Sequence, residues 1–143
     1  MKISTRGRYS LRMMIDLAQH YNDGFVALKD ISARQNISKK YLEQIIPFLN
    51  RNNLLNASKG HMGGYRLAKP PRDITVREIL ESAEGSLTPV SCMDNSPNLC
   101  KNCGDCLTLP IYEGLYEVIN NYLSGITLED IIEKAAAEFI YTI

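Results

Sequence analysis

The sequence predicts a mainly α-helical fold with one small β-hairpin, arranged as a winged helix-turn-helix followed by a long dimerisation helix. Three observations predict this fold class. Apolar residues recur at helical spacing through most of the 143 residues, as in amphipathic helices packed around a core. A glycine-rich hairpin follows the third helical segment. The apolar stripe that follows the last cysteine is too broad for one short loop to cover.

Charge divides the chain into two halves. Residues 1–72 contain 13 Lys and Arg against 4 Asp and Glu, a formal charge of +9, whereas residues 73–143 contain 3 against 12, a formal charge of −9. Ordinary solvated charges do not account for so uneven a distribution, so the first half is expected to bind a polyanion. Pro70 and Pro71 mark the boundary. We therefore predict a DNA-binding domain at 1–72 and a cysteine-loop sensor and dimerisation region at 73–143.

Residues 4–21 are expected to form the first helix, which ends in a turn at residues 22–24. Arg8 and Arg12 lie one helical turn apart on its polar side. The opposite side carries an apolar stripe that is expected to pack in the core. That stripe consists of Leu11, Met14, Ile15, Ala18 and Tyr21.

Two helices at residues 28–35 and 39–52, joined by a short turn, give the layout of a helix-turn-helix. Ser38 is a good N-cap for the second helix, and Pro47 is expected to bend this helix without ending it. One face of the second helix is apolar and the other is polar. The apolar residues are Leu42, Ile45, Ile46 and Leu49, and the polar residues are Lys39, Lys40, Glu43 and Gln44.

A β-hairpin is expected from strands at residues 54–58 and 65–67. Its tip combines glycines with Lys59 and His61. Glycine lets a backbone approach a phosphate or a groove wall closely, so we interpret the hairpin as a wing that contacts DNA; a mobile turn is the alternative. His61 is far in sequence from the cysteines and is expected to contact solvent or phosphate and not a metal.

The acidic half is expected to contain helices at residues 73–84, 110–123 and 127–139. The first is capped near Thr75, and the third by Thr127 with Asp130 as a weak capping box. We interpret the middle one as a helix that packs against its counterpart in a second subunit, with an ordinary intrachain core as the alternative. Its apolar stripe consists of Ile111, Leu115, Val118, Ile119 and Tyr122.

The four cysteines, Cys92, Cys100, Cys103 and Cys106, lie within fifteen residues among polar and loop-forming neighbours. Such neighbours do not build an apolar core around a buried thiol. A metal or iron-sulfur site is the leading interpretation, ahead of a redox-active disulfide pair or uncoordinated thiols. The close spacing of the last three cysteines favours an iron-sulfur cluster, 2Fe-2S or 4Fe-4S, over zinc.

The surroundings of the cysteines are acidic, because Lys101 is the only basic residue between Glu78 and Glu133. A negative field disfavours addition of an electron, so a cluster held there is expected to have a low reduction potential. The chain starts without an apolar targeting segment, and no run is long enough to span a membrane. We expect a cytoplasmic protein, in which disulfides rarely persist.

The sequence contains no catalytic constellation. It lacks a glycine-rich nucleotide-binding loop, and its two histidines have no nucleophile arranged near them in sequence. We therefore expect a protein that is not an enzyme.

Five segments together resemble the IscR/NsrR-type family of small winged helix-turn-helix regulators, over nearly the whole chain. They are STRGRYSLRMM, ISKKYLEQI, SKGHMGGYRL, ITVREILESAEG and CLTLPIYEGLYEVINNYLSGITLEDI. The resemblance implies a dimeric winged helix-turn-helix with a long dimerisation helix. It implies transcription control that responds to an iron-sulfur cluster.

The resemblance also implies that Cys92, Cys100 and Cys106 are the family's three cysteine ligands. Seven residues separate Cys92 from Cys100 where the IscR pattern has five, and Leu109 stands where such proteins can carry a ligand histidine. Cys103, a carboxylate or a residue of the partner subunit is then the fourth ligand.

The resemblance places Ser38, Tyr41, Glu43 and Gln44 on the recognition helix, with Gln44 as the best candidate for a base contact. Lys59 stands where many relatives have arginine, which predicts altered readout at the wing. A homodimer would place two recognition helices in successive major grooves of double-stranded DNA. The full set of expected DNA-binding residues is Arg8, Ser38, Lys39, Lys40, Tyr41, Glu43, Gln44, Lys59, Gly60 and His61.

Other functional classes are a zinc-stabilised or thiol-disulfide redox-sensing winged-helix repressor, and an iron-sulfur electron-transfer protein that does not bind DNA. The last leaves the basic half and the wing without a role.

Overall fold

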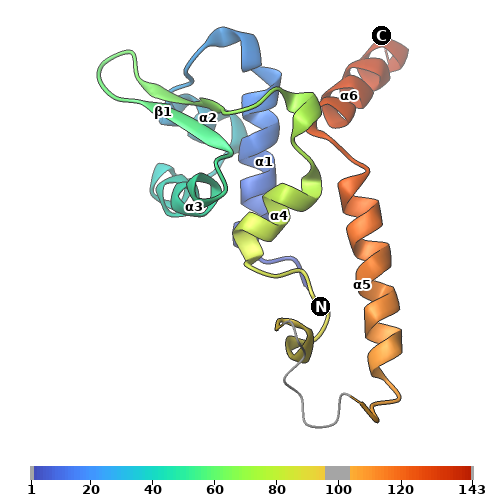
Figure 1. Ribbon diagram of the computed structural model, residues 1–143. Helices are drawn as coiled ribbons and strands as arrows, with labels where there is room; N and C mark the ends of the chain where they lie inside the picture. The colour runs from blue at the N-terminus through green and yellow to red at the C-terminus, as the bar shows by residue number, and fades with distance from the viewer. Residues whose placement is uncertain (1, 96–103, 143) are drawn as a thin grey trace.

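The computed structural model describes residues 2–95 and 104–142, and the side chains of residues 139–142 lie outside the described part. The prediction of a mainly helical fold with one small hairpin is confirmed (Figure 1). The elements in chain order are α1 (Thr5–Gln19), η1 (Tyr21–Asp23), α2 (Leu28–Gln35), α3 (Lys39–Arg51), β1 (Leu55–Ser58), β2 (Gly64–Leu67), η2 (Pro71–Asp73), α4 (Val76–Glu84), η3 (Ser91–Met93), α5 (Leu109–Ser124) and α6 (Leu128–Thr142).

One hydrophobic core joins α1, α2, α3, the hairpin and α4. Both halves of the charge-divided sequence contribute to it, since Ile79 of α4 and Leu128 at the start of α6 are completely buried beside residues of α1. The fully buried large side chains include Met13, Met14, Leu17, Ile31, Leu42, Ile45, Leu49, Leu54 and Ile74.

The buried side of α1 is wider than the stripe expected from sequence. Met13 and Leu17 are buried, whereas Leu11 and Ile15 are half-buried and pack at the edge of the core. The reason is that α1 contacts α2 and α3 on one side and α4 and α6 on another. The helix also ends at Gln19, two residues earlier than expected, and the next residues form the short turn η1.

The helix caps lie where the sequence predicts them. The Ser38 hydroxyl accepts a hydrogen bond from the amide of Tyr41 at 3.1 Å, and Thr75 forms a capping box with Glu78. The Asp130 amide donates to the Thr127 hydroxyl at 3.1 Å, and the Thr127 amide donates to the Asp130 carboxylate at 3.0 Å. α3 continues through Pro47 to Arg51. α4 begins at Val76, three residues later than expected, because residues 71–73 form the turn η2.

The hairpin strands β1 and β2 pair antiparallel, and we call them, with the connecting residues 59–63, the wing. A third segment supports the wing: the amide and carbonyl of Val26 exchange bonds of 2.8 and 2.9 Å with those of Tyr65. A Cβ atom at Gly64 would lie 2.1 Å from the Val26 carbonyl oxygen, and one at Gly63 would lie 2.2 Å from the Ser58 carbonyl oxygen. These two glycines are therefore needed to close the wing itself.

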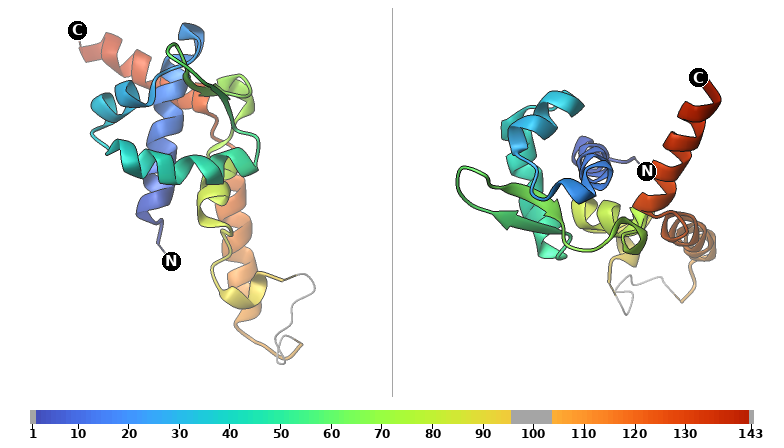
Figure 2. Two further views of the ribbon diagram at one scale, coloured as in Figure 1. Left: turned by 90° about the vertical axis from the view of Figure 1, so that its left-hand side faces the viewer. Right: turned by 90° about the horizontal axis from the view of Figure 1, so that it is seen from above.

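Most of the apolar stripe of α5 is exposed in the part of the chain that the structure describes, although Ile119 is half-buried. Ile111, Val118 and Tyr122 are 66%, 65% and 69% exposed, and no residue of α5 is buried. We call the part formed by α1 to α4 and the wing the head. α5 runs beside α4 of the head, and α6 extends away from the wing (Figures 1 and 2). Among the described residues most of this stripe is left open, which fits the expected contact with a second subunit better than an intrachain core.

The end of α5 nearest α6 is fastened to the head. The Val76 amide donates to the Ile126 carbonyl at 2.9 Å, and the Leu128 amide donates to the Ile74 carbonyl at 3.0 Å. One turn and a half earlier, the Nε atom of Arg77 donates to the Asn120 side chain at 2.8 Å. Among the described residues, no helix is long and apolar enough to cross a membrane.

Candidate nucleic-acid interface and cysteine segment

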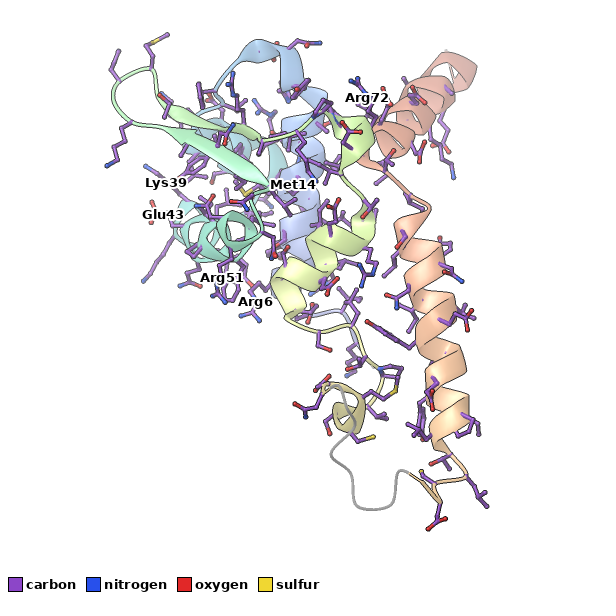
Figure 3. All side chains as sticks on the ribbon, viewed as in Figure 1. Arg6, Met14, Lys39, Glu43, Arg51 and Arg72 are labelled. Atoms are coloured by element: carbon purple, nitrogen blue, oxygen red, sulfur yellow. The ribbon has the colours of Figure 1, made fainter. Side chains whose placement is uncertain are left out.

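The polar face of α3 points away from the core. Ser38, Lys39, Lys40, Glu43 and Gln44 are all exposed. The apolar spacing of this helix places its buried side chains on the opposite face, which leaves the predicted recognition residues free for a ligand. Lys39 and Glu43 point outward from α3, on the side that also carries the wing (Figure 3).

An open groove of about 490 Å³ lies between α3 and the wing. Lys39 and Glu43 of α3 and Lys59 and His61 of the wing line it. Lys29 of α2 also lines the groove, a position that the helix and wing motifs did not predict. The groove thus gathers three lysines from three separate elements around a single carboxylate, an arrangement suited to a phosphate backbone.

Tyr41 is half-buried, because its ring packs against α1. The rings of Tyr9 and Tyr41 meet edge-to-face with centroids 5.4 Å apart. The guanidinium groups of Arg12 and Arg8 lie 5.2 and 6.0 Å from the centre of the Tyr9 ring. Tyr41 therefore fixes the first turn of α3 on α1, and Arg8 remains exposed beside it, also bonded to the hydroxyl of Thr5.

An ion pair with a buried carboxylate, which the sequence pattern did not reveal, joins α2 to α1. Asp16 is completely buried, and its carboxylate accepts bonds of 3.0 and 2.8 Å from the guanidinium of Arg34. The side-chain amide of Gln35 donates to it at 3.0 Å, and the Gln35 carbonyl accepts from Arg12. Burial acts to raise the pKa of Asp16, but the bonds from Arg34 and Gln35 outweigh it and hold this pKa below the ordinary value.

The cysteine segment, residues 86–108, connects α4 to α5. Cys92 lies in η3 and Cys106 lies just before α5, and both thiols are free and half-buried. Cys100 and Cys103 lie outside the described residues. The Asp94 carboxylate accepts a hydrogen bond of 2.8 Å from the Ser86 hydroxyl and a second from Thr88. This polar turn folds the Cys92 part of the segment back against the end of α4.

The environment of Cys106 favours its thiolate. Hydrogen bonds from the Thr108 hydroxyl, 3.3 Å from the sulfur, and from the amides of Thr108 and Leu109 hold the pKa of Cys106 below its ordinary value. These amides are at the start of α5, where helix amides lack partners. A thiolate is the form of cysteine that binds metals and reacts with oxidants.

The described residues do not by themselves bring together three His, Cys, Asp or Glu side chains in a metal-binding group. The wing, which carries His61, and the described residues 86–95 and 104–108 lie at different ends of the molecule (Figure 1). Cys92 and Cys106 are nevertheless suitable donors, since both are free, half-buried thiols in a polar segment. The donor chemistry of this part of the segment fits a thiolate-bound metal or cluster.

Comparisons with known proteins agree with these features. The model of the Rrf2 family, described as "Iron-dependent Transcriptional regulator", matches residues 3–134. The HTH-type transcriptional regulator IscR of Photorhabdus laumondii is 36% identical over 134 residues, which cover 94% of this chain and 80% of that protein.

Two solved structures share the fold at substantial sequence identity. IscR of T. potens superposes with a TM-score of 0.75 at 38% identity, covering 94% of this chain and 88% of the other. CymR, the global cysteine regulator of B. subtilis, superposes with a TM-score of 0.71 at 34% identity, covering 94% and 98%. The expected family resemblance and winged-helix fold are confirmed.

Proposed function

Because this chain belongs to the Rrf2 family and is thus a transcriptional regulator and not an enzyme, we propose that it binds double-stranded DNA as a cytoplasmic homodimer under the control of an iron-sulfur cluster. Residues 1–72 are assigned to DNA binding, and residues 73–143 to sensing and dimerisation. The observation that carries this proposal is the combination of a basic groove at α3 and the wing with free thiols at the far end of the molecule.

The DNA-binding role is supported by the exposed polar face of α3 and the lysines along the groove. Gln44 is assigned to a base edge, most naturally adenine, from the first turns of α3. Phosphates are assigned to Arg8, Lys39, Lys40 and Lys59. Ser38 and Tyr41 position the start of the helix by the contacts described above, and Glu43, Gly60 and His61 complete the face.

Replacement of Lys59 with alanine is expected to weaken binding to all DNA sequences by about the same factor. A phosphate contact carries no base information, so the salt dependence of log Kd should fall by about one unit per subunit. Titration of a duplex at several salt concentrations measures this slope. Lys134→Ala, which removes an exposed lysine from α6, is the control that should keep the wild-type slope. A loss confined to one DNA sequence would contradict the assignment of Lys59.

Replacement of Gln44 with alanine is expected to relax base preference at one position in each half-site by about 1–3 kcal/mol. The reason is that the two hydrogen bonds of an amide to a base edge discriminate against the other bases. Selection from a randomised duplex library by wild type and variant gives the preference directly. An unchanged preference at every position would remove this role from Gln44.

The sensing role is supported by the chemistry of the described thiols. Cys92, Cys100 and Cys106 are assigned as cluster ligands, with Cys103 as the fourth, and the lowered pKa of Cys106 favours the deprotonated form that such ligation needs. When bound, the cluster supplies redox and ligand-exchange chemistry. The chain's own contribution is to hold thiolates at the junction of α4 and α5.

Protein purified without oxygen is expected to contain iron and acid-labile sulfide in matching amounts, with visible absorbance. Cys106→Ser should lose most of both, since serine is a poor ligand for iron-sulfur clusters. Ser91→Ala, beside Cys92, is the matched control and should keep them. Stoichiometric zinc without sulfide would instead assign the segment to a structural clamp.

A second candidate function is thiol sensing without metal. It is favoured by the free, half-buried thiols of Cys92 and Cys106 and by the lowered pKa of Cys106. CymR, the global cysteine regulator of B. subtilis, shares the fold. Metal-free protein that forms reversible disulfides under mild oxidants would support this function over the cluster.

A further inference from the structure

The N-terminal residues of the chain are bound to the end of α4, where the cysteine segment begins. The backbone amide and the hydroxyl of Ser4 donate hydrogen bonds of 2.9 and 2.6 Å to the same carboxylate oxygen of Glu84. The Ser4 hydroxyl also accepts from the Gly7 amide at 3.0 Å and so caps α1. Glu84 is the last residue of α4, and Asp94 closes back on Ser86 two residues beyond it.

Arg6 extends this contact to the recognition helix. Its Nε atom donates to the Ala83 carbonyl at 2.7 Å, in the last turn of α4 where helix carbonyls lack intrahelical partners. The same guanidinium lies 4.1 Å from the centre of the Phe48 ring, which belongs to α3. One planar side chain therefore touches the end of α4 and the body of α3 at once (Figure 3).

The chain leaves space for this arrangement at Gly7. A Cβ atom there would lie 2.3 Å from the bonded carboxylate oxygen of Glu84 and 3.1 Å from Ile3. A larger residue at position 7 would require the Glu84 carboxylate to shift from its position beside Ser4.

We propose that Arg6 is a positioning residue that passes the state of the cysteine segment to the recognition helix, with Ser4 and Glu84 holding it in place. Any change that turns or displaces the end of α4 moves the Ala83 carbonyl and the Glu84 carboxylate, and both are bonded to residues 4–6. The Phe48 ring then follows the Arg6 guanidinium. This inference rests on the proposed cluster control of DNA binding.

Arg51 provides a matched control. Its guanidinium lies 4.5 Å from the same Phe48 ring, and among the described residues it makes no hydrogen bond to α4. Arg6→Ala and Arg51→Ala each remove one positive charge and one stacked guanidinium, but only Arg6→Ala cuts the link to Ala83. A second pair acts on the other bond, because Glu84→Gln keeps an acceptor for Ser4 whereas Glu84→Ala removes it.

The test compares the Kd of cluster-loaded and chelator-stripped protein for one duplex, selected from random sequence by the wild type. The ratio of these two values measures the coupling between the cysteine segment and DNA binding. Arg6→Ala and Glu84→Ala are expected to move the ratio about 2- to 30-fold toward one. Arg51→Ala and Glu84→Gln should keep the wild-type ratio, even if overall affinity falls.

Hydrogen exchange at the α3 amides gives a second readout that does not depend on DNA. Removal of the cluster should change exchange in wild type and in Arg51→Ala, but not in Arg6→Ala. If the Kd ratio of the wild type differs from one and Arg6→Ala and Glu84→Ala keep the same ratio, this inference alone is overturned. A wild-type ratio of one would overturn the proposed function and this inference with it.

Discussion

Replacement of Asp16 with alanine is expected to lower the free energy of unfolding by about 3 kcal/mol. Removal of one partner from a buried ion pair leaves the other without its counter-charge, and here it also removes the acceptor for Gln35. The value lies at the lower end of the range for buried pairs, because the Arg34 side chain is 36% exposed and can regain water. Chemical denaturation of both proteins at neutral pH measures the difference.

The stabilisation by Asp16 is expected to depend on pH. Its pKa in the folded protein lies below the ordinary value of 3.8, so the carboxylate contributes fully above that value. The contribution is lost as the pH falls through the folded pKa, because the unfolded chain then binds the proton more readily. The stability difference between wild type and Asp16→Ala should therefore shrink below about pH 4.

Asp30 supplies the control for this prediction. It is an exposed residue of α2, one turn before Arg34, and it influences Arg34 only through the field of its charge. Asp30→Ala should change stability by less than about 1 kcal/mol. A similarly small effect of Asp16→Ala would show that the buried ion pair does not hold α2 on α1.

Replacement of Val118 with glutamate is expected to separate the proposed dimer. Burial of an apolar side chain at an interface contributes about 1.5–3 kcal/mol to the free energy of association. In a twofold-symmetric dimer each substitution occurs twice, so its effect doubles. The dimer dissociation constant should therefore rise by roughly two to four orders of magnitude. Sedimentation equilibrium measures this dissociation constant. Affinity for a duplex with two half-sites should fall in parallel, because a separated monomer can contact only one half-site.

Glu117 is the matched position on the same helix. It is exposed and lies roughly 120° around α5 from the apolar stripe. Glu117→Ala should leave the dissociation constant close to wild type. A Val118→Glu protein that remained a dimer of unchanged affinity would remove the stripe of α5 from the interface.

Local patterns were enough to predict most elements. Helix periodicity and the caps at Ser38, Thr75 and Thr127 depend on residues within about one turn, so the sequence contains the information. The exposed part of the α5 stripe was also predictable, because the stripe is too broad for one short loop to cover. The boundaries at η1 and η2 differ by two or three residues because short turns there replace the expected helix ends.

The polar contacts between distant elements were not predictable. Asp16 and Arg34 are 18 residues apart and Ser4 and Glu84 are 80 residues apart. Periodicity assigns polar residues to solvent unless a partner is known, and the partner is known only after the helices are packed. The wing glycines show the same limit, since the need for Gly64 comes from the Val26 carbonyl on another segment.

The described hydrogen bonds between α5 and the rest of the chain lie toward its C-terminal end. With the backbone pairing of Ile74 with Leu128 as a pivot, the end of α5 next to Cys106 would move most. A helix of 16 residues is about 24 Å long, so a rotation of roughly 5° about the pivot carries the far end about 2 Å. Tyr122, close to the pivot, would hardly move, whereas Ile111 would travel with the cysteines. In a dimer that packs along this stripe, the contacts near Tyr122 would then persist while the distance between the two heads changes.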